Sequence, residues 1–152
     1  MVAVAAKADE SFGNTLAVQR TRAEAARVKN PRSRALERVE RLVHQVLGLP
    51  DVTPEVEGIR YQLLTATAAA VAEAERIGAT RAVVLVHEFV TDATSDERHD
   101  ANAADLRAFA GRVFGKDVTG LDRLLGPVSL SGSDHHRPAL YLGKVRTVLR
   151  AY

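Results

Sequence analysis

The lysine that ends the first apolar run is the residue whose surroundings suggest chemistry most directly. Val2 to Ala6 form the run, Lys7 follows it, and Asp9 and Glu10 come next. Alternate residues of a strand point to the same face, so Asp9 would share the face of Lys7 if the strand continued. A carboxylate there could hold a divalent metal while the lysine steadies a water or a phosphate. The alternative is a solvated pair of charges in a loop.

Arg60 and Gln62 form a second candidate site, near the start of a predicted helix. Both side chains could donate hydrogen bonds to a phosphate, helped by the partial positive charge of the helix N-terminus. The alternative is that Tyr61 packs into the core while its two polar neighbours are simply exposed.

His87 and Glu88 follow the most apolar segment of the chain, at the strand end where ligands gather in open α/β sheets. Together with Asp92 they could form a metal site, or the pair could serve an enzyme that acts on a small molecule. Their spacing matches no ligand motif, and a histidine that ends a strand more often has a structural hydrogen bond. His135 and His136 give a similarly unspecific metal signal.

Basic side chains gather in one stretch, although the formal net charge is only +2. Between residues 20 and 41 they outnumber the acidic ones, and Arg34, Arg38 and Arg41 recur along a predicted helix. This stretch could contact the phosphates of DNA or RNA. It could equally be a solvated, arginine-rich helix face. Between Glu88 and Asp105 acidic residues dominate, and these would repel nucleic acid.

Composition limits the remaining possibilities. The chain has 152 residues, of which 46% are hydrophobic, so we expect one domain over residues 1–152. It has no cysteine, which excludes disulfides, cysteine-ligated zinc, iron–sulfur clusters and thiol catalysis. The apolar stretches are too short to span a membrane, and the N-terminus lacks the pattern of a signal peptide. We therefore expect a cytoplasmic protein with no membrane contact.

Hydrophobic periodicity predicts the elements that position these residues. Strands are expected at residues 2–7, 82–86 and 139–145, and a Gly- and Ser-rich loop at 126–134. Helices are expected at residues 15–28, 34–47, 56–77 and 99–114. Helical connections of this length join parallel neighbouring strands, so the pattern predicts an α/β fold with helices packed on the sheet.

Several segments together carry a family resemblance. They are the strand ending in Lys7, the sequence from Lys7 to Gly13, the helix start from Arg60 to Leu64, the strand at residues 82–89, and the closing segment at 140–145. In combination they resemble an uncharacterised bacterial domain family, which in turn is similar to the PD-(D/E)xK, or restriction-endonuclease-like, superfamily. The resemblance covers most of the chain.

The resemblance implies an α/β fold with a restriction-endonuclease-like mixed sheet flanked by helices, incomplete at the N-terminus. In that superfamily an Asp on one strand and a Glu-x-Lys on the next bind Mg²⁺ and activate water against a phosphodiester. Lys7 corresponds to the motif lysine, and Gln62 to a glutamine that some members add from the following helix. Ala5 stands where the Glu should be. Asp9 and Glu10 are the remaining candidate metal ligands.

These implications lead to two functional hypotheses. The first is a catalytically impaired nuclease-fold protein that engages DNA or RNA through Arg60 and the basic helix and, if active, is a Mg²⁺-dependent phosphodiesterase. The second is a non-catalytic interaction domain that pairs through its open sheet edge, for example as a homo-oligomer.

Overall fold

A mixed four-stranded sheet is the centre of the fold. The computed structural model describes residues 1–7, 10–92, 95–115, 124–130 and 137–149. The strands lie in the order β1-β2-β4-β3, where β1, β2 and β4 are parallel and β3 runs antiparallel to β4. Their bounds are β1 (Val2–Lys7), β2 (Arg81–Val90), β3 (Leu125–Val128) and β4 (Ala139–Val148). The expected α/β class is confirmed at this level.

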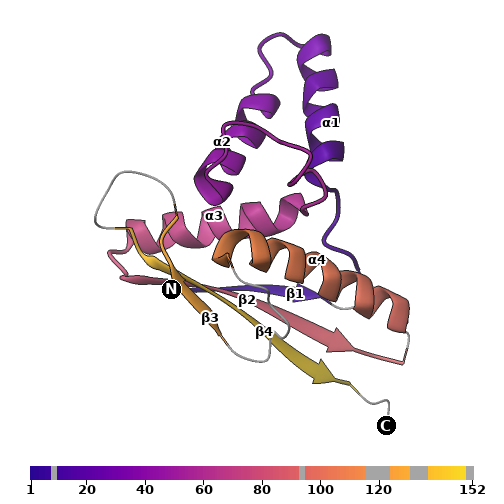
Figure 1. Cartoon of the computed structure of the whole chain (residues 1–152), viewed down its shortest axis with the longest axis vertical. Coiled ribbons are helices and arrows are strands. Elements are labelled where there is room, and N and C mark those ends of the chain that lie inside the picture. The colour runs from indigo at the N-terminus through magenta and orange to yellow at the C-terminus, as the bar shows by residue number, and fades with distance from the viewer. Residues whose placement is uncertain (8–9, 93–94, 116–123, 131–136, 150–152) are drawn as a thin grey trace.

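The helices lie on one side of this sheet. Figure 1 shows α3 (Tyr61–Arg76) and α4 (Asp96–Phe114) packed on one face, while α1 (Leu16–Lys29) and α2 (Ala35–Leu47) rise from this layer as an arm. None of the helices in the described ranges is long and apolar enough to cross a membrane.

The core fills the space between the sheet and the helices. Along β2, Ala82, Val84 and Val86 are buried while the residues between them are only partly covered, because alternate side chains of a strand point to opposite faces. Leu140 and Leu142 of β4 are buried in the same layer. The opposing side chains come from the apolar faces of the helices and include Leu63, Leu64, Leu106 and Phe109.

Most predicted elements exist, and the differences have local causes. The predicted helix at 56–77 begins only at Tyr61, because residues 56–59 form turns, in which Ile59 N donates to Val56 O. Helix α4 begins earlier than predicted, since Ser95 caps it by accepting a hydrogen bond from Arg98 N. The loop predicted from residue 126 was partly wrong: β3 occupies residues 125–128, although its Gly-Pro pair is typical of a turn. Residues 131–136 of that predicted loop lie outside the described ranges.

Candidate functional site at the strand ends

Polar side chains replace apolar ones where the three parallel strands end. In the sheet register Lys7 of β1 pairs with Glu88 of β2, and Glu88 pairs with Arg146 of β4. Paired residues point to the same face, which here is the face covered by helices. Lys7 and Glu88 are each only 3% exposed. Two buried charges therefore lie side by side at the carboxyl edge of the sheet, where open α/β sheets place their ligands.

The ammonium group of Lys7 is held mainly by uncharged acceptors. Its Nζ donates to Gln62 Oε1 at 2.8 Å and to the backbone oxygen of Ser11 at 3.2 Å. The nearest carboxylate oxygen in the described residues, Glu10 Oε1, is 3.5 Å away on a side chain that is 70% exposed. Nζ also lies 5.3 Å from the centre of the Phe12 ring. All three N–H groups of Lys7 therefore have acceptors, and only a loosely held carboxylate balances its charge.

Hydrogen bonds in the loop after β1 explain how Gln62 reaches Lys7. Tyr61 N donates to Asn14 O at 3.0 Å, and Leu16 N donates to Ile59 O at 2.8 Å. These bonds fix the start of α3 next to the chain that leaves β1. The structure thus brings together Lys7 and Gln62, the two residues that the resemblance singled out.

Glu88 is the centre of a second set of contacts. Lys144 Nζ lies 2.8 Å from Glu88 Oε2, and His99 Nδ1 lies 2.7 Å from Glu88 Oε1. Burial alone would raise the pKa of Glu88. The hydrogen bonds from Lys144 and His99, together with the positive charge of Lys144, outweigh burial and hold that pKa below its usual value. Glu88 is therefore a buried, ionised carboxylate at neutral pH.

The contacts of His99 assign its tautomer. Its Nε2 lies 3.3 Å from a terminal nitrogen of Arg146, and a guanidinium group can only donate. Nε2 therefore accepts, and Nδ1 carries the proton that His99 donates to Glu88. Since Arg146 is exposed, the chain of contacts from buried Glu88 reaches the surface through it.

A narrow crevice, which leaves no room for a water-sized sphere, lies among these groups. It is lined by Lys7, Phe12, Val86, Glu88, Asn102, Leu106 and Lys144. Asn102 Nδ2 donates to the backbone oxygen of Glu10 at 3.1 Å, whereas its buried Oδ1 has no hydrogen-bond partner among the described residues. One buried acceptor is thus unused at this site.

Arg60 is committed to structural contacts. Its Nε lies 2.8 Å from Asp105 Oδ2, and a terminal nitrogen donates to Gly13 O at 2.7 Å. The Arg60 side chain is 26% exposed and ties the start of α3 to α4 and to the loop after β1. Its predicted contact with nucleic acid would have to use the terminal guanidinium nitrogen that neither of these two contacts engages.

The idea that His87 and Glu88 act as a pair was wrong, because neighbours on a strand point to opposite faces. His87 lies on the face away from the helices, where its Nε2 is 2.8 Å from Thr147 Oγ1 and its ring packs on Phe89. Asp9, His135 and His136 lie outside the described residues.

The described residues do not fit the Mg²⁺ that the resemblance implies. Ala5 offers no ligand at the position of the motif Glu. Of the nearby carboxylates, Glu10 is exposed beside Lys7, and Glu88 is engaged by Lys144. Within the described ranges no three His, Cys, Asp or Glu side chains group in a way that could hold a metal ion.

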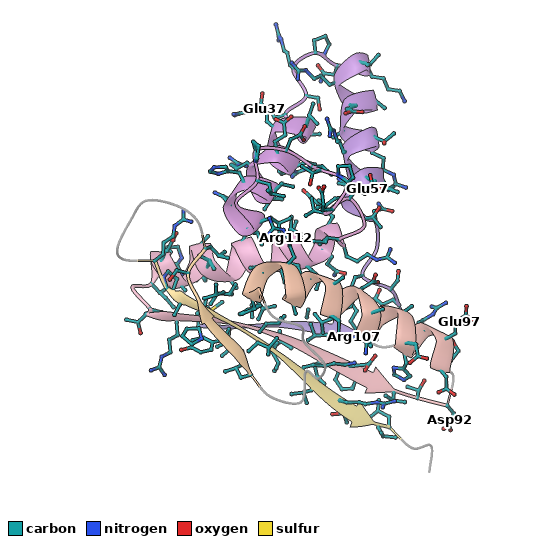
Figure 2. The ribbon with its side chains drawn as sticks, in the orientation of Figure 1. Glu37, Glu57, Asp92, Glu97, Arg107 and Arg112 are labelled. Atoms are coloured by element: carbon teal, nitrogen blue, oxygen red, sulfur yellow. The ribbon has the colours of Figure 1, made fainter. Side chains whose placement is uncertain are left out.

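The three arginines predicted to contact nucleic acid lie together at the far end of the arm. Arg34, Arg38 and Arg41 line one surface hollow beside the first turns of α2, together with Ser33, Ala35 and Glu37. Figure 2 shows Glu37 at this end of the arm, away from the sheet. Arg34 is paired with Glu37 at 2.9 Å, whereas no ion pair within the described ranges engages Arg38 or Arg41.

Sequence reasoning missed Lys144, Arg146 and His99. Lys144 was part of the closing segment, but its place beside Glu88 depends on the register between β2 and β4, which a single sequence does not show. His99 was assigned only to a helix. The signal that could have found it is its position four residues after Ser95, in the first turns of a helix that follows the strand carrying Glu88.

One comparison with known proteins gave a match. The family model described as Domain of unknown function (DUF6946) matches residues 1–148. No curated protein and no solved structure matches this chain.

Proposed function

Because this chain belongs to the DUF6946 family, a domain of unknown function, we propose a function from the chain's own residues: a nuclease-fold protein that binds DNA or RNA and is impaired in cleaving it. The main support is the 2.8 Å hydrogen bond between Lys7 and Gln62 at the carboxyl edge of the sheet. These residues correspond to the lysine and the glutamine of the superfamily that the sequence resembles.

The charges around Lys7 favour an anionic ligand. Lys7, Lys144 and Arg146 contribute three positive charges, and the buried carboxylate among them is Glu88. A surplus of positive charge in a partly buried site attracts phosphate groups. Asp96 and Glu97 in the first turn of α4 are acidic and exposed. Figure 2 shows Glu97 at the side of the molecule where β2 ends. A phosphate would therefore approach from the side of Arg146 rather than across the start of α4.

The arm supplies a second positive surface. Arg38 and Arg41 are exposed and one turn apart on α2, and Arg34 adjoins them at the helix start. Arginines in such a row can each neutralise one backbone phosphate without reading the base sequence. The proposal therefore has nucleic acid contacting the arm through its backbone.

Binding measured by fluorescence anisotropy tests this proposal. A labelled mixed-sequence DNA duplex and a labelled single-stranded RNA are titrated at salt concentrations from about 50 to about 200 mM, over which phosphate contacts weaken strongly. We expect affinity to fall with salt. The triple variant Arg34→Ala/Arg38→Ala/Arg41→Ala should bind more weakly and reduce the slope of log K against log salt by about 2 to 3.

A matched variant removes charge elsewhere. Arg81→Ala/Arg107→Ala deletes two exposed arginines outside both positive surfaces and should keep the wild-type slope. Arg146→Ala tests the strand ends without disturbing a buried lysine, and should also weaken binding. Absence of binding, or binding that does not depend on salt, would refute the proposal.

The position of β1 favours a second candidate function, an interaction domain that pairs through its sheet edge. Strand β1 is at the edge of the sheet, and both backbone groups of Met1 bond to β2, through Arg81 O and Val83 N. Backbone groups alternate along a strand, so those of Val2, Val4 and Ala6 face the open edge. Such an edge can add a strand from another chain.

Light scattering during size-exclusion chromatography tests this candidate. Val4→Pro removes one outward N–H group and should convert an edge-paired dimer into a monomer. Val4→Ala keeps the N–H group and should leave the dimer intact. A wild-type protein that is monomeric at all concentrations would exclude edge pairing with a second copy.

A further inference from the structure

The sheet face away from the helices is largely apolar in its described part. Pairing and alternation place on this face Val2 and Val4 of β1, Leu85 and Phe89 of β2 and Val145 of β4, with Arg81 at the amino end of β2. Figure 1 shows α1 to α4 on the other side of the sheet. The charged residues at the ends of the same strands, Lys7, Glu88 and Lys144, belong to the helix-covered face.

Much of this face is accessible. Val2 is 56% exposed, Val4 58% and Val145 43%, and among the strand residues that alternation places on the described part of this face, Arg81 at the amino end of β2 is the one charged side chain. Leu124, which is 51% exposed, extends it, since a Cβ at Gly143 would lie 3.2 Å from Leu124 Cδ1. A sheet face that meets water normally carries polar residues, and parallel strands are normally covered on both faces. A largely apolar exposed surface of this kind marks an interface.

The charge and the size of the face fit a second copy of the chain. Arg81 is the first residue of β2 and is exposed, so it lies at one end of the face, and two copies packed through the central part of the face would bury no charge. β1 has six residues and β2 and β4 have ten each, so three strands about 4.8 Å apart with a rise of about 3.3 Å per residue cover a flat area on the order of 400 Å². The accessible area exceeds this flat area because side chains project from the face, and a standard interface buries roughly 800 Å² per partner.

We propose that two copies of this chain pack face to face through this surface, with two sheets stacked about 10 Å apart around a two-fold axis. Val145 on β4, Leu85 on β2 and Val4 on β1 lie in the interface. Lys7, Glu88 and Lys144 at the strand ends, and the arm formed by α1 and α2, are on the other side of each sheet. Both regions stay accessible to nucleic acid.

Sedimentation equilibrium of the full chain tests the proposal. We expect the wild-type protein to have the mass of a dimer at micromolar concentration. Val145→Lys places a charge in the interface on an inner strand, and should weaken dimerisation at least about 30-fold, since a buried unpaired lysine costs several kcal/mol. Val2→Lys, at a more exposed position, is a second variant that carries less risk to the fold.

The matched control is Val28→Lys. Val28 is an apolar residue on α1 that is 84% exposed and lies outside the sheet, so this variant should remain a dimer. Circular dichroism confirms that each variant is folded. A wild-type monomer at all concentrations would overturn the proposal and leave a different chain as the occupant of the face.

The experiment also separates this face from the β1 edge. Val145 is on β4, and β2 lies between β4 and β1, so Val145→Lys does not touch the β1 edge. A dimer that survives Val145→Lys and Val2→Lys but dissociates with Val4→Pro would pair through the edge, and the face-to-face arrangement would be wrong.

Discussion

Lys7 and Gln62 are joined by a hydrogen bond of 2.8 Å, although 55 residues separate them in the chain. The bond links the last residue of β1 to the first turn of α3. It gives a hydrogen-bond acceptor to the ammonium group of Lys7, which is 3% exposed. A buried ammonium group that loses an acceptor keeps the cost of its desolvation. The pair is therefore a structural element of the site whatever ligand the site takes.

Gln62→Ala should lower the free energy of unfolding by about 1 to 3 kcal/mol, because Lys7 would keep its burial and lose its shortest hydrogen bond. Urea denaturation followed by circular dichroism measures the change. Gln19→Ala, on α1, removes a glutamine that is outside the site and is less exposed than Gln62, and should change stability by less than about 0.5 kcal/mol. Equal effects of the two substitutions would show that the bond to Lys7 contributes nothing.

Glu88 should make stability depend on pH in the acidic range. Its pKa is lower in the folded protein than the ordinary value of 4.5, so folding favours the ionised form. The resulting stabilisation is fully present above pH 4.5 and is lost as pH falls through the folded pKa. At neutral pH, Glu88→Gln should be less stable than wild type, and the difference should shrink as pH falls below 4.5.

Urea denaturation at a series of pH values checks this prediction. Glu57→Gln, which removes an exposed carboxylate on the surface (Figure 2), should follow the wild-type curve. A stability difference between wild type and Glu88→Gln that stays constant from neutral pH to pH 3 would contradict the role assigned to Lys144 and His99.

Gly126 should not tolerate a side chain. Its φ angle is +115°, and a Cβ there would lie 2.5 Å from the backbone oxygen of Leu140. Gly126→Ala should therefore lower the free energy of unfolding by about 2 kcal/mol or more by disturbing the pairing of β3 with β4. Gly58→Ala is the matched control, because a Cβ at that position meets nothing within 4 Å. Thermal unfolding of both variants should show a large decrease in Tm for Gly126→Ala alone.

Ala5→Glu should restore some Mg²⁺-dependent cleavage of DNA. Ala5 shares a strand face with Lys7, and its register partners across the sheet are Val86 and then Lys144. A carboxylate there recreates the Glu-x-Lys pattern, with Glu88 as a second carboxylate on the neighbouring strand. We expect Mg²⁺-dependent nicking of supercoiled plasmid DNA at least about tenfold above wild type. Ala5→Gln has a similar size without the charge and should stay at the wild-type level, and Lys7→Met should abolish the gain. Equal nicking by Ala5→Glu and Ala5→Gln would exclude latent catalysis.

The sequence was most informative where local patterns dominate. The periodicity of Val39, Val43 and Val46 predicted α2, and the run of valines from residue 83 predicted the central strand. The ends were less accurate, because β2 and β4 continue past their apolar runs into Glu88 and Arg146. Glu88 is acceptable in a buried strand because Lys144 and His99 satisfy its carboxylate.

Half of the site could not be predicted from one sequence, because it depends on how the strands pair. Lys7 and Gln62 could be singled out because a motif and a helix start mark them. Lys144 and Arg146 become site residues only through the parallel register of β2 and β4, and a shift of one residue would turn both to the opposite face. The charge reversal between residues 88 and 105 hid His99 in a stretch that looks merely acidic.

Arg60 connects three segments that are distant in the sequence: it starts α3, pairs with Asp105 on α4 and donates to Gly13 O after β1. Gln62, Asn102 and the loop that covers Lys7 are all within a few residues of these anchor points. Segments fixed to a common point tend to open together rather than one at a time. The edge of the sheet that holds Lys7 and Glu88 should therefore behave as a single cooperative unit, whose backbone amides exchange their hydrogens at a shared rate.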